Sequence, residues 1–257
     1  MHQNRLTIWE EVGLAWEMYK DHYKPFILVF LISVSFPTFT IFLGLAVNAL
    51  VLIAQPPAYT YLVLMVTVTV LIGLIFIFTA FQACQYGLSY EIIASGDLFT
   101  EFRTALGYFK RYWWKYALVA ALVTLPSLFF NSLQQTTFEG KIASLLVELM
   151  AQTLFITTFP ALTVRGSLTQ AIKENFVVLR KRWVDVGIIC LLFYLAFRLP
   201  LSIIESLFLI FSIDFDLSDP LVLFLGFIYV TILVITGIVG QGVRSLVLTK
   251  IYLEERP

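Results

Sequence analysis

Six long apolar runs constrain the fold of this 257-residue chain more than any other feature. A helix that crosses the roughly 30 Å hydrocarbon core of a bilayer needs about 20 apolar residues. Runs of that length lie at approximately 25–54, 59–86, 115–135, 142–163, 185–212 and 220–249. Hydrophobic residues make up 60% of the chain and charged residues 13%, against about half and about a quarter in soluble domains. The sequence predicts an all-α polytopic membrane protein with six transmembrane helices, forming a single membrane domain over residues 1–257.

The distribution of Lys and Arg predicts how the chain is oriented. Fifteen of the 17 basic residues lie on one side of the predicted helices. They occupy the N-terminal segment, the connections between the second and third and between the fourth and fifth runs, and the C-terminal end. Because Lys- and Arg-rich segments stay in the cytoplasm, we expect a multi-pass protein of the cytoplasmic membrane, the inner membrane of the cell, with both termini in the cytoplasm.

The segments that precede the first, third and fifth runs resemble one another. Offsets of 90 and 70 residues align them without a gap and bring together Thr7, Asp97 and Ser167, all good helix N-caps. Thr7 with Glu10, and Ser167 with Gln170, predict capping boxes. The apolar positions that follow share helical spacing; they are Ile8, Leu98 and Leu168, then Val12, Phe102 and Ile172, then Trp16, Leu106 and Phe176, then Tyr19, Phe109 and Leu179, and finally Tyr23, Trp113 and Trp183.

A helix with an aromatic-rich apolar face and a basic polar face lies in the plane of the membrane interface. We therefore predict three amphipathic interfacial helices on the cytoplasmic side, in a threefold internal repeat over approximately 7–95, 97–165 and 167–257. Each first span contains a proline and each second span a glutamine near its cytoplasmic end; these are Pro37, Pro126 and Pro200, and Gln82, Gln152 and Gln241. Gly237, Gly240 and Gly242 predict close helix packing in the last span.

The stretch PALTVRGSLTQAI at 160–172, continuing to LRKRW at 179–183, carries a family resemblance. It resembles the membrane-domain superfamily found in some bacterial glycerophosphoryl diester phosphodiesterases and in YciC-like inner-membrane proteins. Residues 15–24 and 248–252 fit the same pattern. The resemblance implies a six-helix membrane module with interfacial helices. It implies no phosphodiesterase activity, because the catalytic domain of the larger relatives has no counterpart in this sequence.

Ionisable and amide side chains inside the predicted spans are the candidates for a polar site. Such residues usually mark a pathway or a specific pair. Glu148 and Arg198 reach a similar depth from different spans, which predicts an ion pair with Glu205 one to two turns further out. These three residues could form an outward-opening site for an ion or an anionic substrate. They could instead be a structural ion pair, with Glu205 extending to the outer interface, and we favour this structural interpretation. Gln82, Gln152 and Gln241 could line a cavity, although hydrogen bonds between helices are the favoured interpretation.

Basic and aromatic side chains at the cytoplasmic ends of two spans suit anionic lipid headgroups. They are Lys110, Arg111, Trp113, Arg180, Lys181, Arg182 and Trp183. Membrane lipids are therefore the expected partners. No nucleic-acid module is predicted, because the aromatic residues belong to the membrane interface, and the sequence defines no protein partner.

The residue inventory argues against an enzyme. The histidines, His2 and His22, cannot build a catalytic triad or a metal site, and no span carries a histidine or an activated-serine arrangement. We expect no cofactor and no metal. The favoured hypothesis is a non-enzymatic integral membrane protein of structural, assembly or lipid-organising type. The alternative is a small-solute or ion transporter with a polar site at Glu148 and Arg198.

Overall fold

A computed structural model describes residues 7–51, 79–95, 102–134, 138–198, 200 and 220–256. Every regular element within these residues is helical, so the predicted all-α class is confirmed there. The elements are α1 (Ile8–Val51), a helix over 79–95, α3 (Phe102–Gln134), α4 (Phe138–Phe155), α5 (Thr158–Arg165), α6 (Leu168–Phe193), α8 (Pro220–Ile235) and α9 (Gln241–Glu255), with π-helical segments η1 (Tyr194–Arg198) and η2 (Thr236–Gly240).

Two helical stretches are long and apolar enough to cross a bilayer. They are Leu145–Arg165, from α4 into α5, and Gly226–Glu255, from α8 into α9. Both coincide with predicted spans. The other four predicted spans include residues outside the described part of the chain, so the six-span arrangement stays a prediction.

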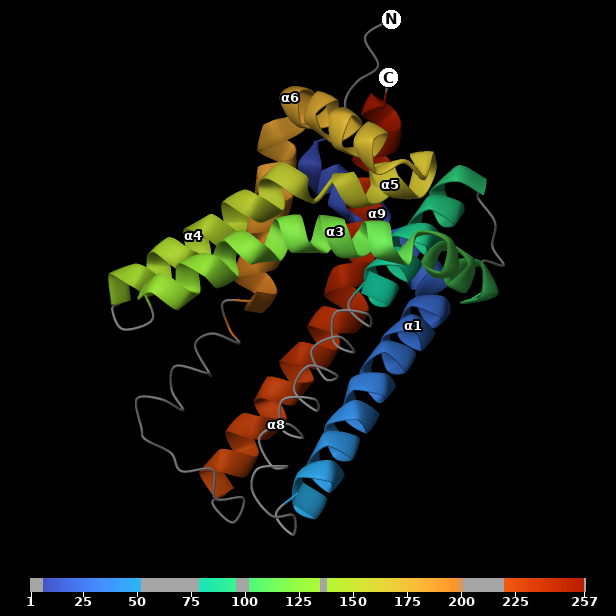
Figure 1. The fold of residues 1–257 in the computed structure, drawn as a ribbon. Helices are drawn as coiled ribbons and strands as arrows, with labels where there is room; N and C mark the ends of the chain where they lie inside the picture. The colour runs from blue at the N-terminus through green and yellow to red at the C-terminus, as the bar shows by residue number, and fades with distance from the viewer. Residues whose placement is uncertain are drawn as a thin grey trace, which may run out of the picture.

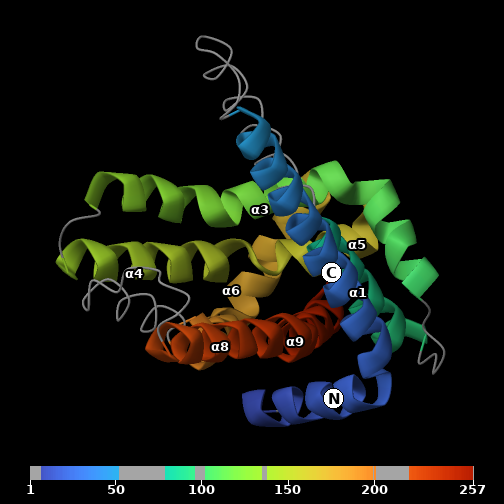
Figure 2. The ribbon, with the colours of Figure 1, turned by 90° about the horizontal axis from the view of Figure 1, so that it is seen from below.

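The helices are arranged as an antiparallel hairpin and two further long arms (Figure 1). Helices α3 and α4 lie side by side in both Figure 1 and Figure 2, whereas α1 and α8 leave the centre in a different direction. The start of α1 and the end of α9 lie close together on α6.

Capping chemistry explains where α1 begins. The Thr7 backbone N–H donates to Glu10 Oε2 at 2.6 Å, and the Glu10 N–H donates to Thr7 Oγ1 at 3.4 Å. This reciprocal pair confirms the capping box predicted there. Ser167 also caps a helix, in extended backbone conformation before α6, but its side chain makes no capping hydrogen bond. The predicted box with Gln170 is therefore wrong, because only the backbone conformation of Ser167 serves as a cap. Asp97 lies outside the described residues.

Both α1 and α6 are kinked at the same distance from their caps. His22 has φ −122° and ψ 22° inside α1, and Arg182 has φ −131° and ψ 27° inside α6. Each residue lies 15 positions after its cap, at Thr7 and Ser167. Figure 2 shows the first part of α1 turning sharply into the long arm. The predicted interfacial segments at 7–22 and 167–182 are therefore helical, and they form the first limbs of α1 and α6, each separated by the kink from the helix that follows.

Burial follows the repeat alignment. Four aligned sets are buried in all members: Ala15, Ala105 and Asn175; Phe26, Tyr116 and Val186; Val29, Val119 and Ile189; and Phe30, Ala120 and Cys190. Among the aligned sets made up of large hydrophobic residues, two are exposed in all members: Trp16, Leu106 and Phe176; and Tyr23, Trp113 and Trp183. Aligned residues thus face the same way, which supports the predicted threefold repeat.

Glycines bring the last helical arm close to α1. A Cβ on Gly237 would lie 1.9 Å from Phe30 Cε2, and one on Gly242 would lie 2.6 Å from Tyr19 Cε2. Neither contact leaves room for a side chain, because the aromatic rings occupy the space above the glycines. Close packing was predicted for this glycine cluster, and the structure places α1 as its partner.

Candidate functional site

An ionic cluster lies where α1 begins, α6 bends and α9 ends. We define it as Glu11, Lys181, Arg182, Asp185, Lys250, Glu254 and Glu255. Arg182 is at its centre: Nη2 lies 2.6 Å from Glu11 Oε1, and Nη1 lies 3.6 Å from Glu255 Oε1 and 3.9 Å from Glu254 Oε2. Its Nε pairs with Asp185. One guanidinium thus holds carboxylates from three helices.

Burial gives this cluster its electrostatic character. The side chains of Glu11 and Arg182 are 0% and 4% exposed. Desolvation raises the pKa of Glu11 above its ordinary 4.5, although the hydrogen bond from Arg182 acts in the opposite direction. The desolvation of Arg182 is outweighed by its hydrogen bonds to Glu11 and Asp185, so the pKa of Arg182 is raised and it stays charged.

The two lysines extend the ionic cluster without neutralising it. Lys181 Nζ lies 3.3 Å from Glu255 Oε2, and Lys250 Nζ lies 3.7 Å from Glu254 Oε1. Four carboxylates therefore face three cations, and Glu11 Oε2 is buried with no hydrogen-bond partner. A surplus of negative charge with an unsatisfied buried oxygen makes the removal of the buried cation, Arg182, costly.

A second set of contacts fixes the same end of the molecule. Arg165 Nε at the end of α5 lies 2.8 Å from Glu174 Oε1 in α6. The Tyr252 hydroxyl in α9 donates to the other oxygen of Glu174. Between α5 and α6 the chain turns at Gly166, whose φ of +66° is a conformation that glycine adopts without strain. Helices α5, α6 and α9 are thus tied together beside the ionic cluster.

A series of polar contacts links α4, α6 and α9 near Gln152. Gln152 Nε2 donates to Glu148 Oε1 at 3.1 Å, while Arg244 Nη2 donates to Gln152 Oε1 at 2.8 Å and to Cys190 Sγ at 3.6 Å. Arg244 is 8% exposed, and its Nε is buried with no hydrogen-bond partner. Arg244 is one of the basic residues that the predicted topology places at the cytoplasmic C-terminal end. Its position inside the apolar run 220–249 was the signal that it is buried.

The predicted polar candidates are only partly brought together. Glu148 and Gln152 share a hydrogen bond, Gln82 is buried, and Gln241 is half-buried. Within the described part of the chain, no hydrogen bond joins the three glutamines to one another. The side chains of Arg198 and Glu205 lie outside the described residues, so the Glu148–Arg198 pair stays a prediction.

The predicted headgroup residues divide into exposed and buried members. Those exposed on the surface are Lys110, Arg111, Trp113, Arg180, Lys181 and Trp183. Arg111 and Lys115 both lie over the Tyr112 ring, at 5.5 and 5.3 Å from its centre. Arg182 differs, because its side chain is buried against carboxylates in the ionic cluster and presents no charge to a headgroup.

All five tryptophans of the chain are exposed. The exposed fractions are 65% for Trp9, 42% for Trp16, 42% for Trp113, 48% for Trp114 and 65% for Trp183. They all lie in the segments that precede the first, third and fifth apolar runs. Large aromatic side chains normally bury most of their surface in a protein core, so this pattern needs an environment that is neither core nor bulk water.

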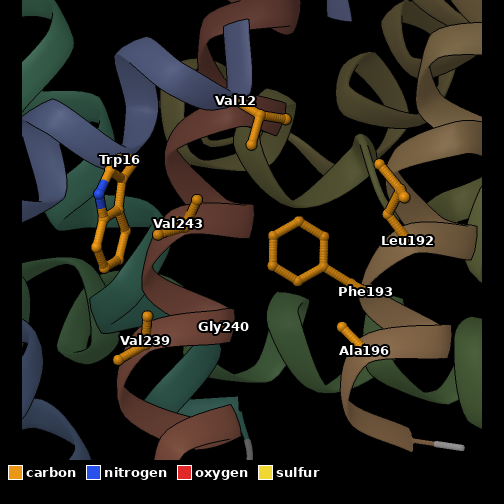
Figure 3. Close-up of a pocket in the computed structure, with 8 residues that line it drawn as sticks. All are labelled: Val12, Trp16, Leu192, Phe193, Ala196, Val239, Gly240 and Val243. Carbon is orange, nitrogen blue, oxygen red and sulfur yellow. The ribbon is translucent and has the colours of Figure 1, made fainter. Parts of the chain in front are cut away.

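An apolar pocket of about 280 Å³ lies under the first limb of α1 (Figure 3). One wall comes from the end of α6 and from η1, and the other from η2 and the start of α9. Val12 and Trp16 of α1 lie over it. The remaining lining residues are Leu192, Phe193, Ala196, Val239, Gly240 and Val243. No charged side chain takes part in the lining.

Among the residues that the structure describes, no three His, Cys, Asp or Glu side chains form a group suited to a metal ion. Cys84 and Cys190 are buried free thiols. Comparison of the chain with protein-family models, with curated proteins and with solved structures found no match. Any functional assignment therefore depends on the geometry of the chain itself.

Proposed function

We propose that this chain is a non-enzymatic integral membrane protein of structural, assembly or lipid-organising type. In this proposal six spans cross the cytoplasmic membrane, and both termini lie in the cytoplasm. The observation that carries the proposal is the exposure of all five tryptophans in the three segments predicted to lie at the interface.

The physical argument starts from the chemistry of tryptophan. Its large apolar ring gains free energy by leaving water, while its indole N–H prefers a polar partner. The headgroup region of a bilayer satisfies both, which is why tryptophan is enriched there. The aligned side chains Tyr23, Trp113 and Trp183 are 43%, 42% and 65% exposed. Equivalent positions in three repeats thus offer aromatic rings to the same kind of environment.

The positions of the described ends support the proposed topology. Glu11 near the start of α1 and Glu255 at the end of α9 both contact Arg182. The two ends of the chain therefore lie on one side of the molecule, as an even number of spans requires. The exposed cations Lys110, Arg111 and Arg180 lie in the same three segments as the tryptophans, where anionic headgroups would attract them.

Membrane insertion is tested by reconstituting the protein into vesicles of phosphatidylcholine and phosphatidylglycerol and washing them with alkaline carbonate. An integral protein stays with the vesicles, whereas a surface-bound protein is released. Tryptophan emission should be quenched most by lipids brominated near the headgroup and little by aqueous iodide. Release by carbonate, or strong iodide quenching with no effect of the brominated lipids, would contradict the proposal.

The topology is tested by single cysteines in a variant in which Cys84 and Cys190 are replaced by serine. A membrane-impermeant maleimide applied to the outside of cells should label Lys141→Cys and leave Lys110→Cys unlabelled until the membrane is opened. Both substituted positions come from predicted connections, so the pair serves as its own control. Equal labelling of the two cysteines in intact cells would refute the orientation.

The transporter alternative is favoured by one observation, the partly buried chain of Glu148, Gln152 and Arg244. Ionisable groups at depth often line pathways, but none of these three lines the apolar pocket. A packing role predicts that Arg244→Met lowers the melting temperature in detergent. A transport role predicts that it abolishes ion or solute flux in vesicles while the melting temperature stays unchanged.

A further inference from the structure

We propose that the apolar pocket binds one acyl chain of a membrane phospholipid. This inference rests on the proposed membrane location and goes beyond it, because it assigns a specific lipid site to a defined place in the fold. The site lies between the two helical arms of the third repeat, under the first limb of α1 (Figure 3).

The walls of the pocket are formed where both arms depart from α-helical geometry. Ala196 belongs to η1, and Leu192 and Phe193 lie just before it; Val239 and Gly240 belong to η2, and Val243 lies just after it. π-helical segments are rare and occur frequently at functional sites, because the extra residue widens the helix. Two such segments therefore lie on opposite walls of one pocket.

The chemistry of the lining selects an apolar chain. Every side chain in the lining is apolar apart from the indole N–H of Trp16. A polar solute would lose its hydrogen bonds to water and find no partners there. An acyl chain has no hydrogen bonds to lose, and each methylene that it buries is stabilising.

The surroundings of the pocket point to the bilayer as the source of the chain. On the same two arms, Leu191, Leu195 and Ile235 are exposed apolar side chains at 41%, 47% and 47%. The outer surface beside the pocket is therefore as apolar as its lining, so a chain can enter from the side without crossing water. Trp16, which lies over the pocket and is 42% exposed, belongs to the proposed interfacial set. With Trp16 at the level of the headgroups, the pocket below it lies at the top of the acyl-chain region.

The volume limits what the pocket can hold. At about 280 Å³ it lies near the lower limit of the roughly 300–1,000 Å³ typical of small-molecule sites. It therefore accommodates part of one acyl chain rather than a whole lipid. The headgroup of the bound lipid would stay outside, at the level of the tryptophans.

The test fills the pocket from one wall in the full-length protein. Ala196→Phe adds a ring inside the pocket, whereas Leu195→Phe adds a ring of the same kind at the neighbouring exposed position. Each protein is reconstituted in vesicles of phosphatidylglycerol and phosphatidylcholine, extracted into mild detergent and examined by native mass spectrometry. We expect wild type and Leu195→Phe to retain one phospholipid, and Ala196→Phe to retain it about tenfold less, since excluding about two methylenes has that effect.

Several results would overturn the proposal. They are equal phospholipid retention by Ala196→Phe and wild type, no stoichiometric lipid on wild type, and retention of a free fatty acid in place of the phospholipid. Circular dichroism checks that each variant is folded, and Val239→Phe fills the pocket from the opposite wall if Ala196→Phe does not fold. A protein that resists carbonate but retains no lipid refutes only the pocket. A protein released by carbonate refutes the proposed function itself.

Discussion

Replacing Arg182 by methionine should destabilise the protein more than any surface substitution, because it leaves Glu11 buried without a cation. The methionine side chain keeps much of the arginine volume, so the change removes charge with little loss of packing. Glu11 is 0% exposed and Arg182 is its only partner in an ion pair among the described residues. Removing one partner of such a pair costs about 3–5 kcal/mol.

The other partners of Arg182 add little to this magnitude. Asp185 and Glu254 are 30% and 41% exposed and recover hydration when the guanidinium is lost, and exposed pairs are worth at most about 1 kcal/mol each. Glu255 is only 10% exposed, but it keeps Lys181 as its partner at 3.3 Å. A change of 1 kcal/mol shifts the melting temperature of a chain of this size by about 2–4 °C. Combined with the cost of the broken pair, this gives an expected decrease of about 6–20 °C for Arg182→Met.

The assay is thermal unfolding in detergent, followed by circular dichroism, with two comparison variants. Arg180→Met removes a neighbouring exposed cation and should change the free energy of unfolding by less than about 0.5 kcal/mol. The double variant Glu11→Leu/Arg182→Met removes both buried charges and should regain most of the lost stability. The reasoning is refuted if Arg182→Met melts within error of Arg180→Met, or if the double variant is no more stable than Arg182→Met alone.

Three further predictions concern Glu11, Gly242 and Thr7. The pKa of Glu11 is raised in the folded protein, so protonation of this carboxyl group stabilises the fold. The contribution is fully present below the pKa of Glu11 in the unfolded chain, and it is lost as pH rises through the pKa of Glu11 in the folded protein. Arg182 keeps Asp185 and Glu255 as partners when Glu11 is neutral, so Glu11→Gln removes a desolvated charge without leaving the guanidinium unpaired. Glu11→Gln should therefore exceed wild type in melting temperature at pH 7, with the difference shrinking as pH falls towards 4.5, and a constant difference would contradict this. Gly242→Leu should cost about 1–3 kcal/mol by overpacking against Tyr19, while Gly226→Leu, which meets nothing within 4 Å, should be near neutral by the same melting assay. Thr7→Ala should cost about 1 kcal/mol and speed amide exchange in the first turn of α1, and unchanged exchange there would argue against the cap.

Sequence patterns predicted the local features of the fold well. The N-cap positions at Thr7 and Ser167 and the capping box at Thr7 follow from residue type and spacing. These features depend on residues within a few turns of one another. Helical class and the two candidate spans are predictable for the same reason.

Features that depend on distant residues could not be predicted in this way. The role of Arg182 is set by Glu11 and by the end of α9, 171 residues and more than 70 residues away in sequence. In its own segment it looks like one more cation of the Arg180–Arg182 run. Its counterpart His22 shares the kink but not the ion pairs, so the repeat pattern predicts the bend and not the chemistry. The π-helical walls of the pocket likewise have no sequence signal that the spacing of apolar residues could supply.

The pairing of the first and last helices through Arg182 has a consequence for synthesis. Glu11 leaves the ribosome early, but Glu254 and Glu255 are made about 240 residues later, roughly 10–50 s at typical elongation rates. Until then Glu11 and Arg182 lack the neighbouring carboxylates that α9 supplies. A nascent or truncated chain that ends before α9 is therefore left with an incomplete ionic cluster, a mark by which quality-control proteases could distinguish it from the finished protein.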